Sequence, residues 1–452
     1  MSLSVVSFNV GLYEEHLEEA AFLYEQRQAL LVNPEISWAE IGEFEERLEA
    51  HIDALIVGGE LALQIVRERM KGGGPGELYA ALALFCRYRN ATLLAEALRT
   101  LDFTDKARVR ALEEALKQEL PAEWTSFCEH ALQRRDQKLA PILAAVCGFR
   151  RMPLGNQIHA LIANAAPEQV SSSLLHALSR LPTDGALQTL WFWLKHPDPQ
   201  VRSAALLALL RTDPRNVVPH CLGIVSRESW PCIGLGLGGD RSAVGALRQL
   251  VDDGAATADH LLALGLLGDT SVVRTLLNTL ANEPLAAAAA RSLHMITGAP
   301  LFEEEFIPDP IRKDELLPHE LEAWNTRKEL PARPDGEPFG TKTTRLSVDP
   351  VAWDEWLKQH AASFRNDQRY RKGKPCSPLV LLEELAAERS SPLLRQLAYE
   401  ELAIRYGCHI SFEADMLATW QLRALAEMRG WVESQGTPFT PGRWYLAGRL
   451  IE

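Results

Sequence analysis

A glycine-rich stretch in the middle of the chain satisfies the spacing of a dinucleotide-binding loop. Gly234-Leu235-Gly236-Leu237-Gly238-Gly239 fits the pattern G-x-G-x-x-G. In a dinucleotide-binding fold, such a loop would follow a strand and open a helix beneath a pyrophosphate. Here the stretch follows Ser229-Trp230-Pro231 and runs directly into a turn at Asp240. We therefore interpret it as a helix whose glycines permit close approach of neighbouring helices, and we predict no nucleotide cofactor.

Other residue types that do chemistry lack the spacing that the chemistry needs. The sequence has no G-x-S-x-G elbow, Walker loop, H-E-x-x-H or C-x-x-C motif, and its 12 histidines are dispersed. His159, His176 and His260 fall within helical patterns and are interpreted as partly buried or surface residues. We expect a protein that is not an enzyme, with no catalytic residue, no cofactor, no metal site and no small-molecule substrate.

The cysteines also show no chemical pattern. Seven are present, an odd number, and they are scattered along the chain at Cys86, Cys128, Cys147, Cys221, Cys232, Cys376 and Cys408. Such cysteines are typical of buried free thiols in a reducing compartment. The start of the chain lacks a basic leader, and no run of about 18 uncharged apolar residues follows. We expect a soluble, cytoplasmic protein that makes no membrane contact.

Glutamates near the start of the chain could form a charged binding surface. They recur at helical spacing and would make two dense negative stripes if their helices stack: Glu14, Glu15, Glu18, Glu19, Glu43, Glu45, Glu46 and Glu49. One interpretation is a solvated helix face that aids solubility. The other assigns these eight residues to contact with a protein partner, because an acidic surface attracts a basic one over long range.

The overall charge argues against nucleic acid as the partner. The formal net charge is −13, and residues 1–70 alone hold 14 carboxylates against 4 arginines. A nucleic-acid binder needs a basic footprint that displaces counterions. The only basic stretch, Arg365 to Lys374, is short and is explained by a turn at Lys372-Gly373. A second acidic patch, Glu303-Glu304-Glu305 with Asp309, is ambiguous because connectors are commonly acidic.

The elements that would position these residues are helices in a repeating array. Turns that contain Asp184, Asp213, Asp240 and Asp269 are 29, 27 and 29 residues apart, a period that accommodates two short helices and two turns. In the turn at Gly268-Asp269, glycine can end one helix and aspartate can cap the next. Apolar residues then recur at helical spacing. We predict paired helices here, and further helices at 78–88 and 91–101.

Two segments resemble a known repeat. The stretch from His196 to Leu209, HPDPQVRSAALLAL, is similar to the second helix of a HEAT repeat, and residues 261–298 are similar to a complete degenerate copy. The resemblance implies an all-α, HEAT-like solenoid. The copy after Asp213 departs from the pattern at Pro219, where an interior turn of helix should run, so we expect a broken or shortened helix there.

We divide the chain into four regions. Residues 1–150 form an acidic helical region of divergent repeats, and residues 151–300 form the HEAT-like repeats. Residues 301–350 read as an acidic, proline-rich connector with one short helix near 318–328, since Pro308, Pro310, Pro318, Pro331, Pro334 and Pro338 interrupt it. Residues 351–452 form a C-terminal helical region with an aromatic tail at Trp444-Tyr445-Leu446.

The whole layout resembles a family of bacterial HEAT-like proteins found in type VI secretion gene clusters, including the immunity partner of a secreted nuclease toxin. This resemblance implies a non-catalytic scaffold that neutralises a basic toxin domain by occluding its active surface. Two alternatives stay open. One is an adaptor or structural accessory protein of the secretion system. The other is an enzyme related to the phycobilin lyases, which also use HEAT-like repeats.

Overall fold

Helices dominate the fold. The computed structural model describes residues 5–33, 36–163, 165–309, 316–328, 339–388, 390–435 and 438–452. Within these residues, the β-strands form three two-stranded sheets. The predicted all-α class is therefore confirmed. No helix among the described residues has both the length and the apolar character needed to cross a membrane.

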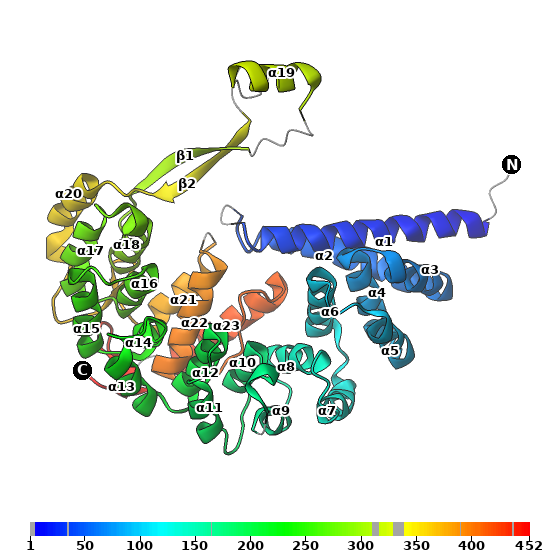
Figure 1. The fold of residues 1–452 in the computed structure, drawn as a ribbon, viewed down its shortest axis with the longest axis horizontal. Helices are drawn as coiled ribbons and strands as arrows, with labels where there is room; N and C mark the ends of the chain where they lie inside the picture. Colours follow the sequence, from blue (N-terminus) through cyan, green and yellow to red (C-terminus); the bar gives the residue numbers. More distant parts are fainter. Residues whose placement is uncertain are drawn as a thin grey trace.

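Most helices form a curved array of two layers (Figure 1). Each inner helix contacts the inner helices before and after it, in the order α4 (Pro75–Arg87), α6 (Lys106–Glu119), α8 (Leu139–Arg150), α10 (Ser172–Arg180), α12 (Pro199–Thr212), α14 (Cys232–Gly238), α16 (Ala258–Leu267) and α18 (Glu283–Thr297). Each outer helix packs against an inner one; the outer helices are α5 (Ala91–Thr100), α7 (Thr125–Gln133), α9 (Gly155–Ile162), α11 (Leu187–Trp193), α13 (Pro214–Ile224), α15 (Arg241–Asp252) and α17 (Val273–Thr279).

The array begins with three helices that pack together at one end: α1 (Val5–Leu30), α2 (Ile41–Val57) and α3 (Gly59–Gly72). One continuous hydrophobic core runs from these helices through the array. The helices predicted at 78–88 and 91–101 correspond to α4 and α5. All seven cysteines are buried and free, as expected.

Aspartates cap three helices of the array, and two of them, Asp240 and Asp269, lie in the predicted Asp-containing turns. The carboxylates of Asp198, Asp240 and Asp269 accept hydrogen bonds from backbone N–H groups two residues later, which satisfies a donor that a helix N-terminus leaves without a partner. Gly268 ends α16 with a φ of 73°, a conformation that favours glycine. Asp213 makes no such cap, and its carboxylate accepts instead from Trp191 Nε1 at 3.2 Å.

Two further expectations concern the glycines of α14 and the proline of α13, and only the first is confirmed. The glycines of α14 do permit close contact, since a Cβ on Gly236 would lie 3.0 Å from the Cα of Ala263. The expected broken or shortened helix at Pro219 is wrong, because α13 runs through Pro219 from Pro214 to Ile224 and is longer than the outer helices α9, α11 and α17. Proline removes one N–H donor from a helix, and in this outer helix the loss is tolerated without a break.

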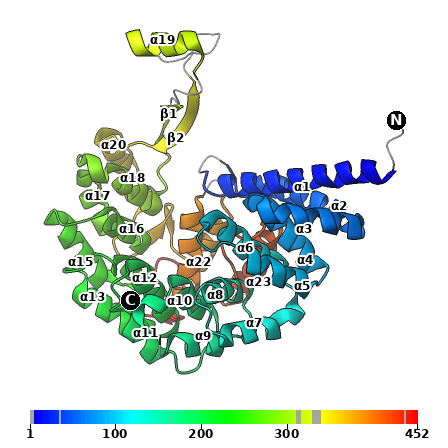
Figure 2. The same ribbon diagram turned by 45° about the vertical axis from the view of Figure 1, so that its right-hand side comes forward.

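The connector of residues 301–350 contains an unforeseen β-ribbon. Strand β1 (Phe302–Pro308) pairs antiparallel with β2 (Gly340–Leu346) over seven residue pairs. Helix α19 (Pro318–Arg327) lies at the far end of the ribbon (Figures 1 and 2) and confirms the helix expected near 318–328. Pro310, Pro331, Pro334 and Pro338 lie outside the described residues. The prediction of a plain connector is thus corrected to a projecting ribbon.

The C-terminal region returns into the concave side of the array, where α21, α22 and α23 lie inside the arc (Figures 1 and 2). Helix α20 packs against α17, α22 against α12 and α14, strand β3 against α18, and α23 against α2. The elements are α20 (Pro350–His360), β3 (Tyr370–Arg371), β4 (Lys374–Pro375), α21 (Pro378–Ala386), α22 (Pro392–Tyr406), α23 (Ala418–Gln435), β5 (Tyr445–Leu446) and β6 (Arg449–Leu450). We call residues 364–452 the C-terminal block. It has its own apolar cluster, which Trp38 from the N-terminal end joins.

Candidate functional site

Basic residues end the inner helices of the first part of the array at a nearly constant spacing. Arg87, Lys117, Arg151, Arg180 and Arg211 lie at the C-terminal ends of α4, α6, α8, α10 and α12, and they are 30, 34, 29 and 31 residues apart. A cation is favoured there because the last carbonyls of a helix carry partial negative charge. This period extends the repeat upstream of residue 178, where the Asp-containing turns do not reveal it.

Acidic residues of the C-terminal block meet this row of cations. Arg180 Nε lies 2.6 Å from a carboxylate oxygen of Glu413, and Arg151 Nη2 lies 2.8 Å from the same oxygen. Arg211 Nη2 lies 2.7 Å from Glu400, which also pairs with Arg180. The concave side of the array is therefore bound to the C-terminal block through buried, charge-assisted contacts.

These cations decide the protonation of the two carboxyls. Burial alone would raise the pKa of Glu400 and Glu413. Arg180 opposes that effect at both residues, with Arg211 beside Glu400 and Arg151 beside Glu413. The pKa of each carboxyl is consequently below its usual range, and both stay ionised within the protein.

In the second part of the array, the C-terminal block supplies the positive groups. Arg405 Nη2 donates to the carbonyls of Gly236 and Gly239 at the end of α14, at 3.1 Å each. Arg369 Nη2 donates to the carbonyl of Leu266 at the end of α16, at 2.8 Å. These guanidinium groups satisfy carbonyls that a helix C-terminus leaves without partners.

Glu401 joins the cations of this second part. It is fully buried and pairs with Arg369, Arg371 and Arg405. Two of these arginines belong to the basic stretch from Arg365 to Lys374. The predicted turn at Lys372-Gly373 is confirmed and joins β3 to β4. The two arginines before it are buried, Arg371 on β3 and Arg369 directly before β3.

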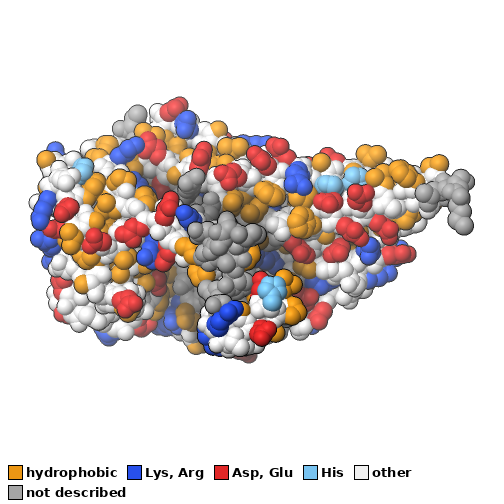
Figure 3. Space-filling view, turned by 90° about the horizontal axis from the view of Figure 1, so that it is seen from above, with side chains coloured by type: hydrophobic (Ala, Val, Ile, Leu, Met, Phe, Trp, Pro, Cys, Tyr) orange, Lys and Arg blue, Asp and Glu red, His pale blue; other side chains and the backbone are white. Residues whose placement is uncertain are grey.

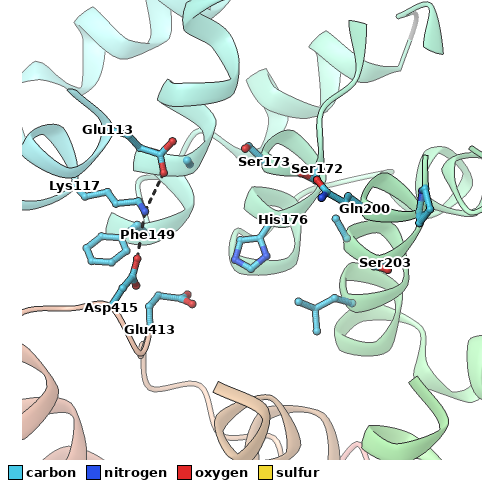
Figure 4. Close-up of a pocket in the computed structure, with 14 residues that line it drawn as sticks. Glu113, Lys117, Phe149, Ser172, Ser173, His176, Gln200, Ser203, Glu413 and Asp415 are labelled. Atoms are coloured by element: carbon cyan, nitrogen blue, oxygen red, sulfur yellow. Dashed lines mark hydrogen bonds and ion pairs between the residues drawn. The ribbon is translucent and has the colours of Figure 1, made fainter. Parts of the chain in front are cut away.

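A hollow of about 600 Å³ remains open between the array and the C-terminal block (Figure 4). Phe149 of α8 and Leu207 of α12 form part of its apolar wall. Polar side chains from the N-terminal halves of α10 and α12 also line it: Ser172, Ser173, His176, Gln200 and Ser203. Lys117 and Asp415 lie at its other side and are shared with an adjoining hollow of about 380 Å³.

His176 projects into this hollow from α10 (Figure 4). Burial lowers the pKa of the imidazole to about 4, and the charge of Arg180 adds to that effect. The imidazole is therefore neutral near pH 7, and its side chain makes no hydrogen bond with a described residue. Such a group can donate or accept a hydrogen bond, but none of the described residues is a nucleophile paired with it.

The predicted glutamate stripes lie on α1 and α2, which pack side by side. Glu15, Glu18, Glu43, Glu46 and Glu49 are exposed, and Glu14 and Glu19 are half-buried. Acidic side chains are visible along this end of the molecule in Figure 3. The exposed and half-buried members of the two stripes therefore lie on neighbouring helices at this end of the molecule, and we call them the acidic face: Glu14, Glu15, Glu18, Glu19, Glu43, Glu46 and Glu49.

Neighbouring residues modify this surface. Glu45 is only 9% exposed: one carboxylate oxygen pairs with Arg27 Nε at 2.7 Å and the other accepts from the Ala418 N–H. It therefore joins α1 to the C-terminal block and cannot serve as an exposed contact, which corrects its assignment to the partner surface. Arg69 pairs with Glu18 at 2.8 Å, and Arg87 pairs with Glu49.

A third hollow of about 400 Å³ lies next to the acidic face. Glu46 and Glu49 line it together with Tyr79, Glu119 and Trp420. The aromatic and acidic lining was not apparent in the sequence, because Trp420 is more than 300 residues away from the other members. Helical spacing placed the glutamates on one face of α2, but the wall opposite them belongs to the C-terminal block.

Among the described residues, no group of three or more His, Cys, Asp or Glu side chains is placed to hold a metal ion. In comparisons with known proteins, no family model, curated protein or solved structure matches this chain.

Proposed function

We propose that this chain is a non-catalytic scaffold that binds a basic, folded protein partner through the acidic face. The observation that carries the proposal is that two neighbouring helices at the end of the array, α1 and α2, both present exposed glutamates. In the more specific form of the proposal, the chain is a cytoplasmic immunity protein. It neutralises a nuclease toxin of a type VI secretion system by covering the toxin's active surface.

The electrostatics of the acidic face favour such a partner. In and just before α2, the exposed acids Glu40, Glu43, Glu46, Glu49 and Asp53 outnumber the single exposed Arg47, whereas the exposed bases of α3 outnumber its exposed acids. The negative surface is therefore that of α1 and α2. Nucleases carry basic clefts for phosphate groups, and a negative surface steers such a cleft toward itself and accelerates association. An inhibitor that occupies the cleft in this way needs no cofactor.

The concave side supports a rigid scaffold. The C-terminal block occupies much of the arc, and its ion pairs with Arg151, Arg180 and Arg211 tie it to three inner helices. A surface held in one conformation loses little conformational freedom on binding, which benefits affinity. The partner then binds at the end of the array, on the acidic face and the surfaces that adjoin it.

The proposal is tested by charge reversal with a matched control. The binding probe is the nuclease domain of the effector that this chain is proposed to neutralise, inactivated at its active site. We expect Glu14→Lys, Glu15→Lys, Glu18→Lys and Glu19→Lys together to weaken binding at least tenfold, roughly 1.4 kcal/mol, in calorimetry at 50 mM salt. The control reverses four exposed acids elsewhere and changes the net charge equally: Asp252→Lys, Asp253→Lys, Asp259→Lys and Glu283→Lys.

Equal effects of the two variants would show that only the net charge matters and would contradict a role for the acidic face. A growth experiment separates inhibition from an adaptor role. Cells that produce the active effector should survive only when they also produce this chain. Survival without the chain would contradict the immunity function.

A further inference from the structure

The ribbon of β1 and β2 with α19 projects from the array without a core of its own. We call this segment the β-arm, described at residues 301–309, 316–328 and 339–346. None of these described residues is buried, and within them β1 pairs only with β2. A two-stranded ribbon is at best marginally stable in water unless another element covers it. At its base, Phe302 packs against His294, and Leu301 and Leu346 pack against the main core. Beyond that base, no described residue of the β-arm is buried by the array.

Hydrogen bonds hold the base of the β-arm, whereas the rest of the β-arm is exposed. The Ser347 N–H donates to the carbonyl of Leu301 at 2.9 Å, and Trp353 Nε1 donates to the carbonyl of Ser347 at 2.7 Å. Trp353 is completely buried. The residues that flank these hydrogen bonds pack against the main core. The β-arm therefore begins at the surface of the array and extends away from it.

The β-arm presents apolar side chains to solvent along its length. Those with exposed fractions between 39% and 56% are Phe302, Phe306, Ile307, Leu317 and Phe339. Surface aromatic residues gathered in one place are typical of protein interfaces. The β-arm is also acidic: Glu303 and Glu305 both lie within ion-pair distance of Arg345, whereas exposed Glu304 forms no ion pair with a described residue.

The position of the β-arm relates it to the acidic face. The β-arm stands at the last inner helix, α18, and α1 lies at the opposite end of the array; both border the same open side of the arc (Figures 1 and 2). A folded protein bound on that side would meet negative charge at both ends, from α1 and α2 and from Glu304. Charge complementarity therefore assigns both surfaces to one basic partner.

We infer that the β-arm is a second contact element, which closes over the basic partner held by the acidic face and covers its own apolar side chains against that partner. This inference rests on the proposed function. It adds that Phe306 and Ile307 contribute apolar contacts, which makes part of the affinity insensitive to salt. The acidic face alone would give an affinity that falls steeply with salt.

The test measures binding of the inactivated effector nuclease domain to the full-length chain and to two variants. Phe306→Ser with Ile307→Ser removes apolar surface from the β-arm. Leu187→Ser with Phe192→Ser removes comparable exposed apolar surface from the outer helix α11, since these residues are 44% and 63% exposed. We expect the β-arm variant to bind about tenfold or more weakly, as truncated interface residues do, and the α11 variant to bind within about twofold of the wild type.

Hydrogen exchange of the unmodified chain provides a second measurement that does not depend on how the variants fold. We expect the amides of β1 and β2 to exchange more slowly in the complex than in the free chain. Wild-type binding with unchanged β-arm exchange and an unaffected β-arm variant would overturn the inference and leave the proposed function in place. Failure of the wild-type chain to bind the nuclease domain would overturn both.

Discussion

At the scale of residues, buried charges are the feature that distinguishes this protein. Glu400, Glu401 and Glu413 are each buried and each contact at least two guanidinium groups. A buried ion pair adds little net stability relative to apolar residues of the same size, but loss of one partner costs about 3–5 kcal/mol. Such networks therefore select one docking geometry and penalise others.

A residue-scale prediction concerns His176 and pH. Its folded-state pKa is about 4, against 6.5 for an unperturbed imidazole. Between those values the unfolded chain binds a proton that the folded protein does not, so stability is complete above pH 6.5 and is lost as the pH falls toward 4. We expect urea denaturation midpoints to decrease over that window, and His176→Gln to make the decrease smaller.

The control for this prediction is His409→Gln, because His409 is exposed. That variant should retain the wild-type pH dependence. His294, whose pKa burial also lowers to about 4, contributes to the part of the decrease that His176→Gln leaves in place, together with His51 and His260, whose pKa values burial also lowers. Identical pH profiles for His176→Gln and the wild type would contradict the assignment.

At the scale of elements, the close approach of inner helices depends on small residues. Gly234 of α14 faces Leu206 of α12, and Gly236 faces Ala263 of α16. The same sequence that satisfies a dinucleotide-binding pattern thus serves helix contacts on both sides. The α-helical backbone of this stretch leaves no loop that could approach a phosphate group.

An element-scale prediction compares two helical glycines. In Gly236→Ala, the new Cβ would lie 3.0 Å from the Cα of Ala263 and from a side-chain carbon of Leu266, so α14 and α16 must separate. We expect a loss of about 1–3 kcal/mol in the free energy of unfolding. In Gly245→Ala on α15, the new Cβ meets nothing within 4 Å, and the better helix propensity should add up to about 1 kcal/mol.

Equilibrium urea denaturation of both variants checks this comparison. The two changes are chemically identical and both lie inside helices. The two changes in the free energy of unfolding are therefore expected to have opposite signs only if the separation of α14 and α16 determines the effect at residue 236. A stabilising effect of Gly236→Ala would show that the contact relaxes without cost.

At the scale of the whole molecule, the C-terminal block and the array act as one structure. Arg405 and Arg369 reach from the C-terminal block to the ends of α14 and α16. Arg27 of α1 donates to the carbonyl of Asp415 across 388 residues of sequence. The curvature of the array is consequently coupled to the fold of the C-terminal block.

A whole-molecule prediction follows from Glu401. Glu401→Gln leaves Arg369, Arg371 and Arg405 without the carboxylate they share, and we expect a loss of about 3–5 kcal/mol in stability. Hydrogen exchange should become faster in both α16 and α22, because the contact joins the array to the C-terminal block. The control is Glu383→Gln, whose partner Lys374 is exposed and whose loss should cost less than about 1 kcal/mol.

Faster exchange in α22 alone would contradict the coupling of the two parts. Equal effects of Glu401→Gln and Glu383→Gln would contradict the importance of burial. Both outcomes can be read from the same exchange experiment.

Local signals in the sequence determined the helices of this protein. Apolar spacing, capping aspartates and the glycine at 268 act within a few residues, so all-α structure, α4, α5 and α19 were predictable. The positions of Glu14 to Glu19 and of Glu43 to Glu49 on α1 and α2 follow from helical spacing as well. The resemblance to HEAT repeats and to an immunity protein remains a prediction.

Only the tertiary structure decided which charged residues are exposed and which are paired. Glu45 has the spacing of a surface residue, yet Arg27 and the C-terminal block bury it. Arg180 and Glu413 meet across 233 residues, and Phe302 of the β-arm pairs with Leu346 although no local pattern marks either as a strand. Such contacts depend on which distant segments come together in the fold. The residues next to each position in the sequence do not specify those contacts, so local sequence patterns could not predict them.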